Sequence, residues 1–157
     1  MIDGYLLLKL IHVLSAAVLF GTGAGIAFFM VCARRTRDPV VAAAVGRMVV
    51  LADFLFTATA VVVQPLSGLA LIRLQGYAPT EPWLLASYAL FVLVGACWLP
   101  VVWIQQRLTR LATEAAAAGE PLPPAYDRLY KVWFGLGWPA FAGVIAIYVL
   151  MMSRPAL

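Results

Sequence analysis

The stretch LKLIHVLSAAVLFGTGAGIAFFM, residues 8–30, decides the fold of this chain. Its apolar run continues without a charged residue from Leu10 to Ala33. A helix needs roughly 20 apolar residues to cross the hydrocarbon core of a bilayer, so this stretch predicts a membrane-spanning helix that begins near Tyr5. Arg34, Arg35 and Arg37 follow this apolar run. A cleavable signal peptide instead has its basic residues first and a shorter apolar core. We therefore expect the segment to stay in the membrane.

The composition of the whole chain agrees with a membrane protein. Of 157 residues, 64% are hydrophobic and 11% are charged, and the mean hydropathy is +0.96. Soluble domains are roughly 45–50% apolar and about 25% charged, so an ordinary soluble enzyme is excluded, as is a disordered chain. The long uninterrupted apolar runs also exclude an outer-membrane barrel, whose strands alternate.

Three further segments are long and apolar enough to span a bilayer, and the first of these three contains one charge, Asp53. No internal repeat or linker divides the chain. The sequence therefore predicts an all-α fold, a four-helix transmembrane bundle with up-and-down topology, in a single integral membrane domain over residues 1–157. The four spans are expected at about 5–33, 48–72, 82–106 and 132–153.

The positions of lysine and arginine predict how the bundle is oriented. Residues 34–47 and 107–131 hold four each, and the other three are Lys9, Arg73 and Arg154. Cytoplasmic loops of membrane proteins carry an excess of these residues, so both long loops are predicted in the cytoplasm and both termini outside, in the cytoplasmic (inner) membrane. The net charge of +4 then reflects topology, and we expect the lipid bilayer and no nucleic acid as partner.

His12, the single histidine, is an ionisable residue inside a predicted span, which makes it a functional-site hypothesis. It lies roughly 10 Å below the start of the first span at 1.5 Å per residue. Polar residues of the other spans are expected at a similar depth, which predicts an outward-facing pocket within the membrane. These residues are Gln64, Ser67, Ser87, Tyr88 and Tyr148.

Two interpretations of His12 stay open. In the first, His12 is the iron ligand of haem b, because imidazole is a common haem ligand and four-helix bundles hold cofactors between facing helices. Lys9 and Arg73 would then pair with the propionates. The remaining candidate cofactor-binding residues are Gln64, Tyr88 and Tyr148.

In the second interpretation the protein is a non-catalytic packing or interaction module, and His12 hydrogen-bonds to another helix through Gln64 or Tyr148. A zinc site is not expected, since a catalytic zinc ion typically has three protein ligands. The sequence contains no GK[ST] loop, GxGxxG, HExxH or paired CxxC motif that would identify catalytic residues.

Asp53 lies about a turn and a half inside the second span and also has two interpretations. As a functional residue it relays protons or gates a cation, and as a structural one it pairs with Arg34, Arg47 or Arg107. A third hypothesis for the protein, a small transporter, requires polar groups that continue across the membrane. The sequence leaves a gap between the residues around His12 and Asp53.

Gly21 and Gly25 have the GxxxG spacing that permits close approach of two membrane helices. The approach can occur within the bundle or between protomers. The second alternative predicts a homo-oligomer that forms through this glycine face.

The motif Lys9-x-x-His12, the Gly21-Thr22-Gly23 stretch and the aromatic-rich run after it resemble the predicted integral membrane family called domain of unknown function 2269. The four-span layout and the length agree with that family, which implies no established activity. More remotely, LKxxH resembles HemJ-type protoporphyrinogen oxidases and CopD-type copper-resistance membrane domains. The HemJ resemblance implies haem b, with His12 as an axial ligand.

The chain departs from the HemJ pattern, because it has no second histidine and no lysine inside the third span. Bis-histidine ligation within one protomer is therefore impossible. A haem would be five-coordinate, use a weak partner such as Met151, or lie between two protomers.

Overall fold

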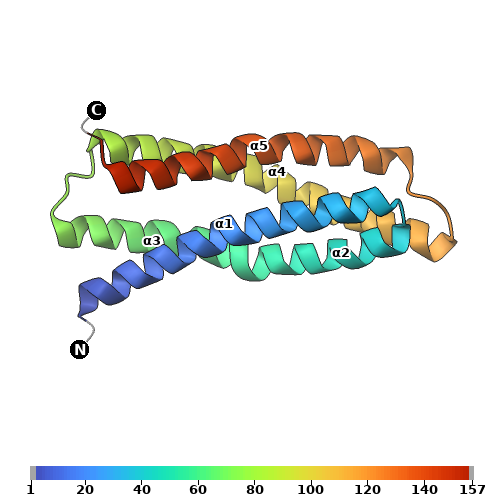
Figure 1. Ribbon diagram of the computed structural model, residues 1–157, viewed down its shortest axis with the longest axis horizontal. Coiled ribbons are helices and arrows are strands. Elements are labelled where there is room, and N and C mark those ends of the chain that lie inside the picture. The colour runs from blue at the N-terminus through green and yellow to red at the C-terminus, as the bar shows by residue number, and fades with distance from the viewer. Residues whose placement is uncertain (1–2, 156–157) are drawn as a thin grey trace.

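The computed structural model describes residues 3–155, which form a bundle of long antiparallel helices without a strand among them (Figure 1). The second span is one continuous helical rod, Pro39–Gln75, that contains a π-helical segment near its middle. Four rods are each long and apolar enough to cross a membrane, as the sequence predicts. The elements are α1 (Gly4–Thr36), α2 (Pro39–Ala52), η1 (Asp53–Thr57), α3 (Ala58–Gln75), α4 (Pro82–Ala118) and α5 (Pro124–Ser153).

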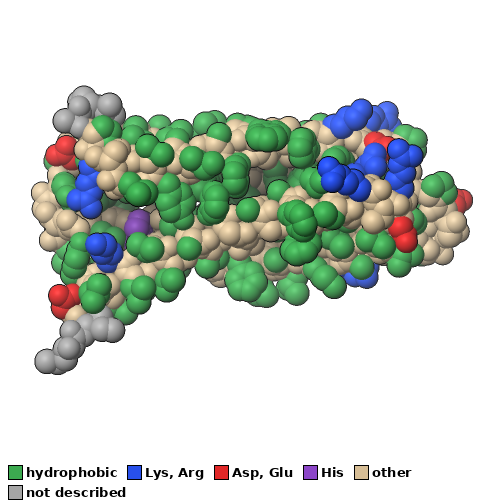
Figure 2. All heavy atoms as spheres, in the orientation of Figure 1, with side chains coloured by type: hydrophobic (Ala, Val, Ile, Leu, Met, Phe, Trp, Pro, Cys, Tyr) green, Lys and Arg blue, Asp and Glu red, His purple; other side chains and the backbone are tan. Residues whose placement is uncertain are grey.

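Both ends of the described chain lie at the same end of the bundle (Figure 1). We call it the terminal end, and it also contains the connection between α3 and α4. The opposite end contains the connections between α1 and α2 and between α4 and α5, and Lys and Arg side chains gather there (Figure 2). We call it the basic end.

The connection between α1 and α2 is much shorter than the predicted loop over residues 34–47, so the predicted bounds of this loop are wrong. Helix α1 continues to Thr36 and α2 begins at Pro39, so only two residues lie between them. Arg37 adopts the left-handed conformation with φ of 57°, and the Asp38 carboxylate accepts a hydrogen bond from the Val40 amide at 2.7 Å. An N-cap acid followed by proline at the first helical position starts a helix efficiently, and this explains the early start.

Close packing is concentrated toward the basic end. Its buried core includes Met30, Leu108 and Tyr126, each at most 2% exposed. A Cβ atom at Gly46 of α2 would lie 2.5 Å from Thr109 Oγ1 of α4, so these two helices pack closely at this glycine. An ion pair of 2.6 Å between Arg34 and Asp127 joins α1 to α5.

The sides of the bundle are apolar, as a surface against lipid requires. Large side chains such as Phe54, Val92 and Met152 are 70% or more exposed, and hydrophobic side chains cover the middle of the face shown in Figure 2. The glycine face belongs to this surface, because a Cβ atom at Gly21 or Gly25 would have no neighbour within 4 Å. The first alternative for these glycines, close approach within the bundle, is therefore wrong.

Candidate functional site

His12 lies on α1 at the interface with α3, and both of its ring nitrogens have partners on α3. Nδ1 is 2.9 Å from Ser67 Oγ, and Nε2 is 3.2 Å from Gln64 Nε2. Ser15, one turn further along α1, donates its hydroxyl hydrogen to Gln64 Oε1. Two residues of α1 and two of α3 thus form one connected polar cluster, which we call the histidine cluster.

The hydrogen bonds around the ring run in one consistent direction. Ser67 Oγ donates to the Val63 carbonyl at 2.7 Å, so it meets His12 with a lone pair and accepts the Nδ1 proton. Gln64 accepts from Ser15 through its oxygen and therefore faces His12 with its amide nitrogen, which donates to the lone pair of Nε2. Since a neutral imidazole has one donor and one acceptor nitrogen, this arrangement fits the Nδ1-protonated tautomer.

A glycine on α3 makes room for the imidazole. A Cβ atom at Gly68 would lie 3.1 Å from His12 Cε1, a separation shorter than ordinary van der Waals contact. The ring is half-buried and remains visible from outside near the terminal end, where it is the purple side chain of Figure 2. The sequence predicts Gln64 as a partner of His12, and the structure confirms that contact.

The other residues proposed for the pocket do not join the histidine cluster. Lys9 is exposed, with Nζ 5.9 Å from the centroid of the Tyr5 ring, and Arg73 is exposed on α3. Tyr148 packs its ring edge-on against Phe20 at 6.0 Å, so the alternative pairing of His12 with Tyr148 is wrong. The Tyr88 hydroxyl is buried and has no hydrogen-bond partner among residues 3–155.

The surroundings of His12 do not fit haem iron as they stand, because neither ring nitrogen is free. Within residues 3–155, no group of three His, Cys, Asp or Glu side chains comes together that would hold a metal ion. An iron atom would require the Gln64 amide to leave Nε2.

A second polar cluster surrounds Asp53, the first residue of the π-helix. The Ala58 amide donates to the Asp53 carbonyl five residues back, the hydrogen bond that defines a π-bulge, and such bulges are frequent at functional sites. The Asp53 side chain is only 4% exposed and points into the bundle. Thr57, one turn later, is 7% exposed, and its hydroxyl has no partner in the described chain.

The carboxyl group of Asp53 accepts hydrogen bonds from uncharged donors, and the predicted pairing with Arg34, Arg47 or Arg107 is wrong. Trp98 donates through Nε1 to Oδ1 at 3.1 Å. With the side-chain amide of Gln105 in the orientation that satisfies both of its polar atoms, its nitrogen donates to Oδ2 at 2.9 Å and its oxygen accepts from Trp133 Nε1 at 3.3 Å. The ion pairs within residues 3–155 join other residues: Arg34–Asp127 and Arg110–Glu114.

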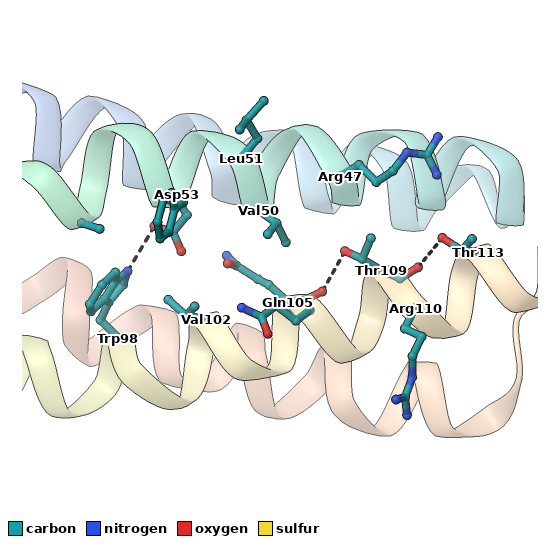
Figure 3. A pocket seen from close by; sticks show the side chains of 13 residues that line it. Arg47, Val50, Leu51, Asp53, Trp98, Val102, Gln105, Thr109, Arg110 and Thr113 are labelled. Carbon is teal, nitrogen blue, oxygen red and sulfur yellow. Dashed lines mark hydrogen bonds between the residues drawn. The ribbon is translucent and has the colours of Figure 1, made fainter.

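A groove of about 640 Å³ runs along this cluster between α2 and α4. Asp53 and Trp98 lie toward one end of it, and Thr113 and Arg110 lie toward the other, nearer the basic end (Figure 3). Thr113 and Thr109 each donate a hydrogen bond to a carbonyl one turn back on α4, those of Thr109 and Gln105. The groove therefore leads from the basic end of the bundle to the buried carboxylate.

Sequence reasoning missed Trp98, Gln105 and Trp133 as partners of Asp53. The third span is predicted to end at residue 106, which places Gln105 at its boundary, and the helix itself continues to Ala118. Buried residues recur at helical spacing across that boundary, and this periodicity was the available signal. The positions are Gln105, Leu108, Ala112 and Ala115.

These features define a four-span α-helical integral membrane protein with two intramembrane polar clusters. The family model described as "Predicted integral membrane protein (DUF2269)" matches residues 6–155, and the chain belongs to that family. No curated protein and no solved structure matches the chain.

Proposed function

We propose that the protein is a membrane packing and interaction module in which His12 fastens α1 to α3. The observation that carries the proposal is the engagement of both imidazole nitrogens by side chains of one neighbouring helix. Hydrogen bonds between membrane helices contribute about 0.6 kcal/mol on average and up to about 1.7 kcal/mol. Two such bonds at one residue, together with the Ser15–Gln64 contact, make the histidine cluster a specific connection between the two helices.

An absorption spectrum and a thermal melt of the detergent-purified protein test this function. The wild type is expected to be colourless as isolated and after haem addition, and His12→Ala is expected to lower the melting temperature. Lys9→Ala is the matched control, because Lys9 lies one turn away on α1 and is exposed. A haem band that is lost in folded His12→Ala, or a melt that His12→Ala leaves unchanged, would overturn the proposal.

Haem b ligation by His12 is the second candidate function. It is favoured by the Nδ1-protonated tautomer, because a ligating histidine usually donates its other ring N–H to a fixed acceptor, as Nδ1 does to Ser67. Lys9 and Arg73 would serve the propionates. In this case Gln64→Ala, which removes the amide from Nε2, is expected to strengthen the haem band, and His12→Ala is expected to abolish it.

The proposed location is the cytoplasmic membrane with the terminal end outside. Eight of the eleven lysines and arginines lie in residues 34–47 and 107–131, which supports a cytoplasmic basic end. Single cysteines introduced at Thr80 and Glu120 test this orientation with a membrane-impermeant thiol reagent in intact cells, in a background where Cys32 and Cys97 are replaced by serine. Labelling at Thr80 and protection at Glu120 are expected, and the reverse pattern would contradict the orientation.

A homo-oligomer that forms through the Gly21 and Gly25 face is part of the same proposal. Both glycines have open space above them, and Gly25 also lines an apolar groove of about 310 Å³ between α1 and α2. Gly21→Ile is expected to reduce the cross-linked dimer in membranes. Gly95→Ile, at another glycine with open space, is the control, and an equal yield of dimer in both variants would contradict this interface.

A further inference from the structure

The buried face of the second span is mostly polar between Asp53 and Ser67. Its residues follow one another at intervals of four, three, four and three, which keeps them on one side of a helix. Asp53, Thr57, Ala60 and Ser67 are buried, and Gln64 is half-buried. Four of these five side chains are polar, on a helix that otherwise faces lipid with leucine, valine and phenylalanine. We call these five residues the polar face.

The polar face joins the two clusters described above. From Asp53 to Ser67 the helix rises roughly 21 Å at 1.5 Å per residue, a large part of the ~30 Å hydrocarbon core. One end of the face is the carboxylate of Asp53, and the other contacts the imidazole of His12 through Gln64 and Ser67. The depth range without polar side chains that the sequence leaves between His12 and Asp53 is thereby reduced to the stretch around Ala60.

Thr57 occupies the position next to that stretch, one turn after Asp53. Its hydroxyl is buried and has no hydrogen-bond partner among the described residues, although threonines in membrane helices ordinarily bond to a carbonyl one turn back. Thr59 does so, with Oγ1 2.6 Å from the Leu55 carbonyl on the exposed side of the helix. Ala60, one turn beyond Thr57, is the smallest residue of the polar face and is 4% exposed.

Each end of the polar face extends toward one end of the bundle. The groove between α2 and α4 leads from the basic end to Asp53 (Figure 3). His12 is half-buried near the terminal end and visible from outside (Figure 2). The groups that face Asp53 from the neighbouring helices are Trp98 and Gln105 on α4, and Trp133 contacts Gln105 from α5.

We propose that the polar face is a proton pathway between Asp53 and His12. A proton that arrives through the groove converts the Asp53 carboxylate into a carboxylic acid. The carboxylic acid then passes a proton through the Thr57 hydroxyl and water beside Ala60 to Nε2 of His12. The Gln64 amide turns its oxygen toward the new N–H. The imidazolium then releases one proton to water at the terminal end, which restores the carboxylate and the neutral ring.

The pathway suits a proton better than a metal cation. A metal ion requires several ligands at one point, and no group of three acidic, histidine or cysteine side chains forms within residues 3–155. A proton needs only a succession of donors and acceptors that a few waters complete. The proposal does not depend on the packing function, because His12 can fasten α1 to α3 in either case.

Proton flux into proteoliposomes tests the pathway. The full chain is reconstituted in vesicles that contain a pH-sensitive dye, and a potassium gradient with valinomycin sets the membrane potential. The wild type is expected to admit protons faster than protein-free vesicles, and Asp53→Asn is expected to return the rate to that background. Glu120→Gln, which changes an exposed carboxylate, is expected to match the wild type.

A pair of threonine variants separates conduction from folding. Thr57→Val and Thr59→Val remove the same hydroxyl from the same helix, but only Thr57 lies on the polar face. Thr57→Val is expected to lose most of the flux while the melting temperature stays near that of the wild type, and Thr59→Val is expected to retain it. A wild-type rate equal to background, full flux in Asp53→Asn, or equal flux in the two threonine variants would overturn the proposal.

Discussion

The imidazole of His12 on α1 lies directly against the α-carbon of Gly68 on α3, where a methyl group would come within 3.1 Å of Cε1. This contact brings the ring close enough to α3 for its two nitrogens to reach Ser67 and Gln64. The glycine therefore belongs to the histidine cluster although it contributes no polar atom.

Replacement of Gly68 by valine is expected to destabilise the protein, because the ring is held by two hydrogen bonds and cannot yield without lengthening them. Overpacking of this kind costs about 1–3 kcal/mol. Gly95→Val is the matched control, since it brings the same change in helix propensity into open space. Thermal melts in detergent measure the difference, and equal melting temperatures of the two variants would show that the contact is not close.

A double-mutant cycle between His12→Ala and Ser67→Ala is expected to give a coupling energy of about 0.6–1.7 kcal/mol, the range found for hydrogen bonds between membrane helices. The same cycle between His12→Ala and Ser87→Ala serves as the control, because Ser87 donates to the Trp83 carbonyl of its own helix. That second coupling is expected near zero. Comparable couplings in both cycles would point to a general effect of losing His12 rather than to the bond with Ser67.

Gln105→Leu is expected to lower the free energy of unfolding by about 1–3 kcal/mol or more, since each buried polar group left without a partner costs about that much. The change removes a donor from Asp53 and an acceptor from Trp133. Gln106→Leu alters an exposed neighbour on the same turn and is expected to have little effect. The fluorescence spectrum checks the cause, because the indole of Trp133 loses its hydrogen bond only in the first variant.

Gly46→Ala is expected to destabilise the contact between α2 and α4, because the new methyl group would lie 2.5 Å from Thr109 Oγ1. Overpacking in a closely packed interface costs about 1–3 kcal/mol. Thr109→Ala in the same chain removes the obstructing hydroxyl and is expected to restore much of the loss. A double variant as unstable as Gly46→Ala alone would place the cause of the loss elsewhere.

Hydropathy alone predicts the four spans, because the energetic demand of the bilayer acts on each helix separately. It also predicts the depth of polar groups, and this is why Gln64 could be named as a partner of His12. Depth does not tell which side of a helix faces which neighbour. Tyr148 lies at a similar predicted depth but packs against Phe20.

The partners of Asp53 could not be predicted, for two physical reasons. The π-bulge at Asp53–Thr57 changes the direction of the side chains after it, and no sequence pattern marks its position. Gln105 also lies at the predicted end of the third span, and hydropathy does not tell which face of α4 is buried there. The buried face includes Gln105, Leu108 and Ala112.

The two-residue turn at Arg37 and Asp38 has a consequence for biosynthesis. Since almost no chain separates α1 from the second span, the two can insert into the bilayer together as one hairpin once Gln75 has been translated. The bonds of His12 to Gln64 and Ser67 lie wholly within this first hairpin. The donors to Asp53 come instead from α4, so the hydrogen bonds of Asp53 can form only after α4 has been synthesised.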